Sequence, residues 1–213
     1  MATKGAFRVE CPHCGESFDA DFWTVVRGDR DEDVKELILS GEFDILMCPK
    51  CEKMFQHEEP FLYLDPSRDL LAFVMPETYL DKKDEWIARM EKDYAPVRAS
   101  LAYGQGVTGE PLYFFGLSPL TSLLGSDRDR EEETEVMEFM AREDGLHLLA
   151  VKPASARELD IPFSVPMPAG LKGRAAALKA AEALRARNDA LPRLKKLIDA
   201  LAALKGDDLP FLK

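Results

Sequence analysis

The chain reads Cys11-Pro12-His13-Cys14-Gly15 near its start and Cys48-Pro49-Lys50-Cys51-Glu52 further on. These two Cys-Pro-x-Cys units contain all four cysteines of the protein. Zn²⁺ readily takes four thiolates in a tetrahedral shell, and a Cys-x-x-Cys turn presents two of them at a suitable separation. The pattern therefore predicts one zinc ion per chain, bound by Cys11, Cys14, Cys48 and Cys51.

The residues around the cysteines suit two tight turns. Pro12 and Pro49 fix φ inside each turn and so reduce the number of backbone states to be frozen. Gly15 follows the first turn, where a positive φ is useful. Glu52 takes the equivalent place in the second turn, which is a departure from the usual glycine.

Other uses of Cys-x-x-Cys are less consistent with the sequence. A thioredoxin-like redox motif needs one pair, whereas this chain has two matched pairs. Structural disulfides are not expected in a cytosolic chain, and iron is the remaining alternative to zinc. Because four cysteines leave no open coordination position, the predicted zinc is structural and not hydrolytic.

The pattern around the turns predicts a zinc ribbon. Phe7–Glu10 alternates into the first turn, and residues 17–26 continue as strand beyond it. Residues 43–47 alternate into the second turn, so each turn is expected at the tip of a hairpin. The intervening residues 15–47 are more than a minimal ribbon needs, and a helix ending at Gly41 accounts for the extra length.

Further elements extend the ribbon into a larger body. Strands are expected over residues 53–56, 61–64, 70–74 and 112–115, with a helix over 81–101 and a glycine loop containing Gly104, Gly106 and Gly109. An acidic helix over 127–142 is expected to turn Val136, Phe139 and Met140 inward. The predicted class is α+β: a zinc-ribbon-like antiparallel β module joined to an α/β body, with a C-terminal helical hairpin.

Three segments are expected along the chain. Residues 1–150 form the zinc-binding domain with its α/β extension, residues 151–170 a proline-rich linker or arm, and residues 171–213 a helical appendage. Two leucine seams mark the appendage, one from Leu171 to Leu184 and one from Leu191 to Leu204. One hairpin cannot bury both seams alone, so packing on the body, self-association or a protein partner is expected.

The net charge of −11 is unevenly distributed. Residues 1–64 hold seven Lys/Arg against fourteen Asp/Glu, whereas residues 171–205 hold nine against three. An acidic zinc module argues against phosphate binding there, and the basic tail lacks interleaved aromatic residues. Nucleic-acid binding is therefore the weaker alternative. No apolar run reaches the length of a membrane span and no secretory leader is apparent, so a cytoplasmic location is expected.

The residues quoted above resemble the CpXC proteins of bacteria and archaea, which are named for two Cys-Pro-x-Cys motifs. Phe22-Trp23, Gly41-Glu42-Phe43 and residues 60–65 extend the resemblance, which covers about the first 115 residues. Leu64 stands where family members often have histidine, and Glu52 is a second departure. The resemblance implies a zinc fold and no particular reaction.

The sequence therefore favours a zinc-stapled structural or binding module over an enzyme. His57, Tyr63 and Asp65 lie near one another in sequence and are the candidates for acid–base chemistry outside the zinc centre. A packed tyrosine ring, a turn-forming aspartate and a polar strand histidine are the preferred interpretation of the same residues. No catalytic residue is predicted.

Overall fold

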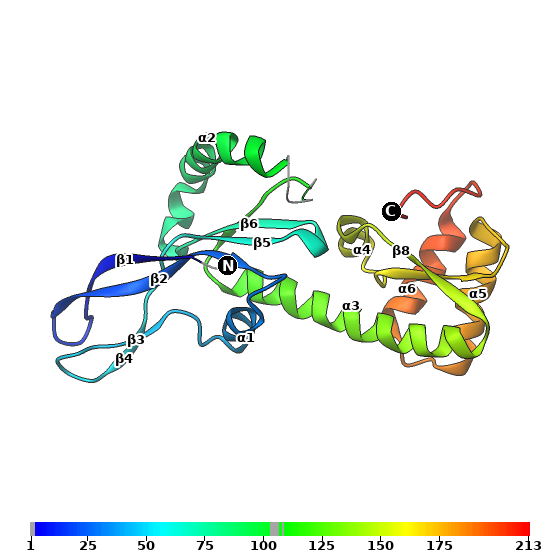
Figure 1. The fold of residues 1–213 in the computed structure, drawn as a ribbon, viewed down its shortest axis with the longest axis horizontal. Coiled ribbons are helices and arrows are strands. Elements are labelled where there is room, and N and C mark those ends of the chain that lie inside the picture. Colours follow the sequence, from blue (N-terminus) through cyan, green and yellow to red (C-terminus); the bar gives the residue numbers. More distant parts are fainter. Residues whose placement is uncertain (1–2, 103–106, 108) are drawn as a thin grey trace. The chain divides into compact units, whose positions relative to one another are not determined.

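A computed structural model describes residues 3–102, 107 and 109–213 of the chain, which divides into two compact units (Figure 1). Unit 1 comprises residues Met1–Leu124 and unit 2 comprises Gly125–Lys213. Helix α3 (Ser118–Glu143) starts in unit 1 and continues in unit 2. Of the expected glycine loop, Gly104 and Gly106 lie outside the described residues.

Unit 1 is a mixed sheet with helices on both faces and a separate small hairpin. The elements before α3 are β1 (Thr3–Glu10), β2 (Ser17–Arg27), α1 (Glu32–Ser40), β3 (Ile45–Met47), β4 (Met54–Gln56), β5 (Phe61–Asp65), η1 (Pro66–Arg68), β6 (Leu70–Met75), η2 (Glu77–Lys82), α2 (Lys83–Ala102) and β7 (Leu112–Phe115). The five-stranded sheet has the order β1-β2-β5-β6-β7, and β3 and β4 pair only with each other.

The sheet combines antiparallel hairpins with parallel joins. β1 pairs antiparallel with β2 along its whole length, but β2 pairs with β5 only over Val25–Arg27, in parallel. β5 and β6 are antiparallel, and β6 and β7 are parallel. Because the β1–β2 pairing extends well beyond the short β2–β5 join, the end of this hairpin that carries the first cysteine turn has no other strand of the sheet beside it.

Apolar residues fill both faces of the sheet. On one face, Val34 and Ile38 of α1 and Leu120 and Leu124 of α3 pack with strand residues such as Val26. The Thr121 hydroxyl donates to the Ile38 carbonyl at 3.1 Å and so joins α3 to α1. On the other face, Leu64, Leu71 and Phe73 pack with Met90 of α2. Every residue of β6 is buried, as expected for a strand covered on both sides.

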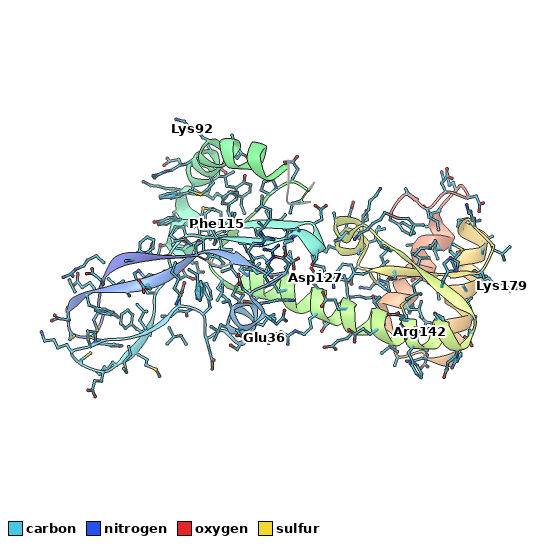
Figure 2. The ribbon with its side chains drawn as sticks, in the orientation of Figure 1. Glu36, Lys92, Phe115, Asp127, Arg142 and Lys179 are labelled. Atoms are coloured by element: carbon cyan, nitrogen blue, oxygen red, sulfur yellow. The ribbon has the colours of Figure 1, made fainter. Side chains whose placement is uncertain are left out.

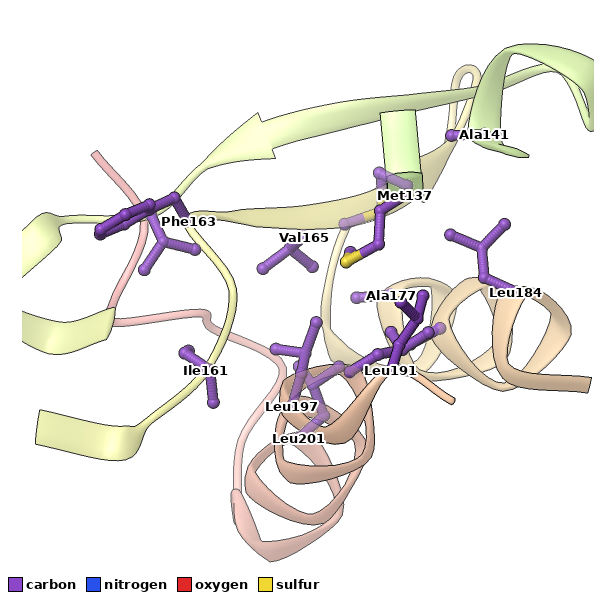
Figure 3. Packing of buried hydrophobic residues seen from close by; sticks show 14 of the residues in the cluster. Met137, Ala141, Ile161, Phe163, Val165, Ala177, Leu184, Leu191, Leu197 and Leu201 are labelled. Carbon is purple, nitrogen blue, oxygen red and sulfur yellow. The ribbon is translucent and has the colours of Figure 1, made fainter. Parts of the chain in front are cut away.

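Unit 2 is built around the antiparallel pair β8 (Leu146–Ala150) and β9 (Ser164–Pro168). It also contains the remainder of α3, α4 (Pro153–Leu159), α5 (Arg174–Arg187) and α6 (Pro192–Ala203). Its core gathers residues from all of these elements, and Figure 3 shows the leucines of α6 facing Val165 of β9 and Met137 of α3.

The leucine seams of the C-terminal helices belong to this core. Leu184 of α5 and Leu194, Leu197 and Leu201 of α6 are fully buried, whereas Leu171 lies outside the helices and is exposed. The seams therefore pack within their own unit, which was one of the three expected outcomes. The predicted helical hairpin is confirmed.

The basic side chains of the hairpin meet acidic ones from α3 and the end of α4. Arg187 pairs with Glu143 and Asp144, while Arg193 and Lys196 both pair with Asp160. The local positive charge that the sequence places on residues 171–205 is thus partly neutralised inside unit 2. This counts against the tail as a contact for phosphate groups.

The prediction of which residues of α3 face inward is wrong by about one residue. Val136 and Phe139 are 40% and 66% exposed, and the buried residues are Met137, Met140 and Ala141. The misassignment has a physical cause, because the same inward stripe carries charged residues nearer the helix start. Asp127, labelled in Figure 2, accepts hydrogen bonds from Arg130 and Arg157 at 3.0 and 2.7 Å and is buried together with Arg130.

Residues 151–170, expected as a linker or arm, are folded instead. They contain α4 and β9, and Ile161, Val165 and Met167 are almost completely buried. The proline content misled the prediction, because β9 pairs only with β8 and an edge strand tolerates prolines. The division into 1–150, 151–170 and 171–213 as independent segments stays a prediction.

The predicted α+β class is confirmed, with four clustered cysteines as in a zinc ribbon and helices at the C-terminus. Within the described ranges, no helix combines the length and the apolar character that crossing a membrane requires.

Candidate metal centre

The first cysteine turn connects β1 to β2. The Cys11 N–H donates to the Glu16 carbonyl at 2.8 Å, and the Gly15 N–H donates to the Cys11 carbonyl at 2.9 Å. Gly15 adopts φ 69°, the left-handed conformation expected for it. The His13 N–H points at the Cys11 Sγ at 3.4 Å, which is the arrangement that stabilises a thiolate.

The second turn connects β3 to β4 and repeats the same backbone pattern. The Cys48 N–H donates to the Lys53 carbonyl and the Glu52 N–H to the Cys48 carbonyl, both at 3.0 Å. Glu52 adopts φ 57° at the position equivalent to Gly15. The turn therefore keeps its geometry without glycine. Glu52 adopts the left-handed conformation, which is unfavourable for a residue that has a side chain.

The two turns bring their four sulfur atoms together. Cys11 and Cys51 are 3.8 Å apart at Sγ, Cys14 and Cys48 are 3.7 Å apart, and all four Sγ atoms lie within 4.8 Å of one another. Sulfurs at the corners of a tetrahedron around zinc, each about 2.3 Å from the metal, would be about 3.8 Å apart. The four cysteines are thus close enough to bind one metal ion.

Comparison with protein families shows that residues 9–105 match the model described as CpXC protein. These residues match the CpXC family. The resemblance seen in the sequence is confirmed, and both cysteine pairs lie within the matched residues. No curated protein matches the chain, and no solved structure matches it either.

The ionisation of the CpXC thiols depends on their surroundings. Backbone N–H groups of Cys51 and Lys50 lower the pKa of Cys48 to about 7. At Cys14 the Glu16 N–H lowers the pKa, but desolvation and hydrogen bonds with the other three thiols outweigh it and raise the pKa to about 12. Four thiols this close cannot all ionise without a cation among them, so the donor set suits a metal dication.

Contacts between the two turns hold them in register. Lys50 donates to Glu16 across the turns at 2.8 Å, on the exposed surface. The Phe55 ring of β4 lies edge-on to both Phe18 and His13, with ring centroids 6.3 and 6.4 Å away. His13 itself is exposed, so it is positioned beside the cluster and not within it.

His57 lies outside the sulfur cluster. Its Nε2 pairs with Glu59 Oε1 at 3.1 Å, and its ring lies 5.2 Å from that of Phe22. The metal-binding group found among the described residues comprises the four cysteines and does not include His57. The sequence favoured a polar histidine on a strand; His57 has polar contacts as expected, but it lies just after the end of β4.

Tyr63 and Asp65 of β5 have the structural environments that the sequence favoured. The Tyr63 ring is fully buried and lies against Gly28, where an added Cβ would be 2.0 Å from the phenol oxygen. Asp65 accepts hydrogen bonds from the Ser67 hydroxyl at 2.6 Å and from the Arg68 N–H at 3.2 Å, so it caps the turn η1. Tyr63 is thus a packed ring, and Asp65 is a turn-forming carboxylate.

One titratable residue near the second turn was missed. Asp44 precedes β3 with φ 57°, and its carbonyl accepts the His57 N–H at 3.2 Å. Burial raises the pKa of the Asp44 carboxyl to about 7; the charges of Glu59 and Glu58 raise it further, and Lys4 opposes them. The run of acidic residues after His57 was the available signal, but nothing in the sequence indicated that Asp44 would face it.

We expect the replacement Glu52→Gly to stabilise the zinc-loaded CpXC domain by about 0.5–1 kcal/mol. A left-handed conformation costs a non-glycine residue about 1–2 kcal/mol, and the greater freedom of glycine in the unfolded chain offsets part of that gain. Urea unfolding monitored by Trp fluorescence measures the change. The matched variant Gly15→Ala should destabilise the domain, and a lower midpoint for Glu52→Gly would contradict the strain argument.

The Asp44 carboxyl should make the stability of the CpXC domain depend on pH. Its pKa is about 7 in the folded chain against 3.8 when unperturbed, so between these values the folded state keeps a proton that the unfolded state has lost. Stability therefore falls as pH rises toward 7 and then levels off. Because the carboxyl is partly exposed to solvent, we expect about 1–2 kcal/mol.

The variant Asp44→Asn should remove this dependence. Its advantage over the wild type should have reached about half of its full size at pH 5.5 and should grow until it levels off above pH 7, as measured by urea unfolding at constant zinc and ionic strength. Subtracting the unfolding free energy of the wild type from that of the variant at each pH cancels the contribution of the thiolates, which both proteins share. An advantage that stays constant over this range would show that Asp44 ionises normally.

Proposed function

We propose that Cys11, Cys14, Cys48 and Cys51 bind one Zn²⁺ ion, and that this ion is structural. The observation that carries the proposal is the pair of sulfur separations, 3.7 and 3.8 Å, which match the edge of a zinc tetrathiolate. Cys11 and Cys48 are almost completely buried, and the backbone of each turn directs N–H groups at the sulfurs.

The chemistry of the donor set supports zinc and a closed shell. Thiolates are soft ligands, and four of them satisfy the tetrahedral preference of Zn²⁺ with no position left for water or substrate. When bound, the ion supplies a cross-link between two hairpins and the charge that keeps the thiols ionised. The described residues around it, such as Lys50 and Phe55, hold the two turns in place.

Metal analysis tests the proposal directly. Protein purified without added metal should contain one zinc per chain, and exchange for Co²⁺ should give the intense sulfur-to-cobalt absorption of a tetrahedral tetrathiolate site. Zinc well below half occupancy, or iron in its place, would exclude the proposal. An absorption band of an octahedral cobalt site would instead exclude the closed sulfur shell.

The proposed biological role is that of a zinc-stapled module for binding another protein or a second copy. Two observations support this role. The four cysteines would leave a bound metal no open position, and Tyr63 and Asp65, which were considered for acid–base chemistry, are a packed ring and a turn-forming carboxylate. A reducing compartment such as the cytoplasm fits the role, because free thiolates persist there.

Interaction through the C-terminal helices is part of this proposal. The leucine seams of α5 and α6 are buried in unit 2, so a partner or a second copy would meet the exposed polar side chains of these helices. Such a contact would weaken as ionic strength rises, because salt screens the attraction between solvent-exposed charges.

A further inference from the structure

The β3–β4 hairpin has apolar side chains on both of its faces. Leu46 and Phe55 lie opposite each other on one face, where Phe55 packs against the first turn. On the other face Met47 lies directly opposite Met54, and Ile45 lies opposite Gln56. We call the surface formed by Ile45, Met47 and Met54 the outer face of the hairpin.

The outer face is open to solvent within unit 1. Met54 is 70% exposed, Met47 63% and Ile45 44%. A two-stranded ribbon with one face in the core normally alternates apolar and polar residues, and apolar residues on both faces indicate a strand covered on both sides. The fold of unit 1 alone therefore does not explain why these three exposed side chains are apolar.

Methionine has properties that suit a contact surface. Its unbranched, polarisable side chain adapts to irregular partners and is common at binding surfaces that accept several sequences. The two methionines sit on strands flanking the second cysteine turn, so the metal cross-link would fix the backbone beneath them. A rigid backbone with adaptable side chains reduces the entropic cost of binding.

Charge indicates the kind of occupant. Residues 1–124 contain 13 Lys/Arg against 23 Asp/Glu, a net charge of −10. Glu42 stands just before β3 and Glu58 and Glu59 follow β4, whereas Lys50 and Lys53 of the second cysteine turn offset part of this charge. Two copies meeting through this face would bring their acidic units together, whereas a cationic segment would be attracted to it.

We propose that the outer face of the β3–β4 hairpin docks a cationic, apolar peptide segment of another protein. This rests on the proposed function, since it names the partner class of the zinc-stapled module. Ile45, Met47 and Met54 would contact the apolar side chains of the segment, and the net negative charge of residues 1–124 would attract its lysines or arginines.

The test uses the full-length chain with [ε-¹³C]methionine, after its zinc content has been measured. The probe is the decapeptide Lys-Leu-Ser-Lys-Leu-Ser-Lys-Leu-Ser-Lys. We expect saturable shifts of the Met47 and Met54 methyl signals, and no shift of the buried Met137. The double variant Met47→Ser/Met54→Ser should bind at least about tenfold more weakly, a loss of about 1.4 kcal/mol. The control Phe139→Ser removes an equally exposed apolar side chain from unit 2 and should bind normally.

Three results would overturn the docking proposal. They are the absence of methyl shifts in zinc-loaded protein, equal binding of a matched peptide with glutamate in place of lysine, and dimerisation in sedimentation experiments that the double variant abolishes. The last result would assign the face to a second copy. Because the metal content is measured on the same sample, a protein that holds one zinc but ignores the peptide refutes the docking proposal alone.

Discussion

Replacing Cys48 by serine is expected to release the metal and to unfold the ribbon of unit 1. Serine keeps the size of the side chain but cannot supply the fourth thiolate, and Cys48 is fully buried at the base of the second turn. In small zinc modules the free energy of metal binding, about 10–16 kcal/mol, is at the same time folding free energy. That is comparable to the whole stability of a typical domain, about 5–15 kcal/mol.

The effect should be confined to unit 1. Calorimetry and metal analysis of Cys48→Ser should show a lost or strongly lowered transition and less than one zinc per chain, while the transition of unit 2 remains. Lys53→Ser is the matched control, because it changes an exposed residue of the same hairpin and leaves all four thiols. If Cys48→Ser melts like the wild type, the metal does not stabilise the fold.

Deleting residues 170–213 is expected to unfold unit 2. The deletion removes α5 and α6, which contribute Leu184, Leu194, Leu197 and Leu201 to its core. Truncating one buried leucine to alanine typically costs about 2–5 kcal/mol, so losing the whole set exceeds what such a unit can sustain. Val165 and Met137 would lose the surface that covers them.

The truncated protein should lose one thermal transition and bind a hydrophobic dye, but it should keep one zinc per chain. Leu171→Ala provides the control, since this exposed leucine precedes α5 and its replacement should cost no more than about 0.5 kcal/mol. A truncated protein that retains both transitions would mean that the helices are an appendage after all, as the sequence first indicated.

The clustering of the four cysteines could be predicted almost entirely from the sequence. Each half of this cluster is a short-range feature, because two cysteines three residues apart, a proline between them and a following turn define it. The strands around the turns followed from alternation, as in Phe7–Glu10. Only the conformation of Glu52 needed the structure, since its identity argued against the positive φ that the backbone pattern requires.

Unit 2 was harder to predict because charged residues occupy buried positions where hydrophobic periodicity predicts apolar ones. The inward stripe of α3 starts with Asp127, Arg130 and Glu133, which are buried and paired, so hydrophobic periodicity favoured the wrong face. Glu133 accepts the Leu194 N–H at 2.7 Å at the start of α6, a contact between residues 61 positions apart. No local pattern reveals that a charged residue has a partner so distant in the chain.

The sulfur pair Cys14–Cys48 joins residues 34 positions apart, and α1 lies entirely within the loop that this pair closes. A covalent cross-link of that span would remove about 4 kcal/mol of chain entropy from the denatured ensemble, and a bound metal acts in the same way while it stays bound. Metal uptake at the proposed site would thus lower the entropic barrier to docking α1 on the sheet, although α1 contains none of the four cysteines. A chelator should therefore accelerate hydrogen exchange in a helix that never touches the ion.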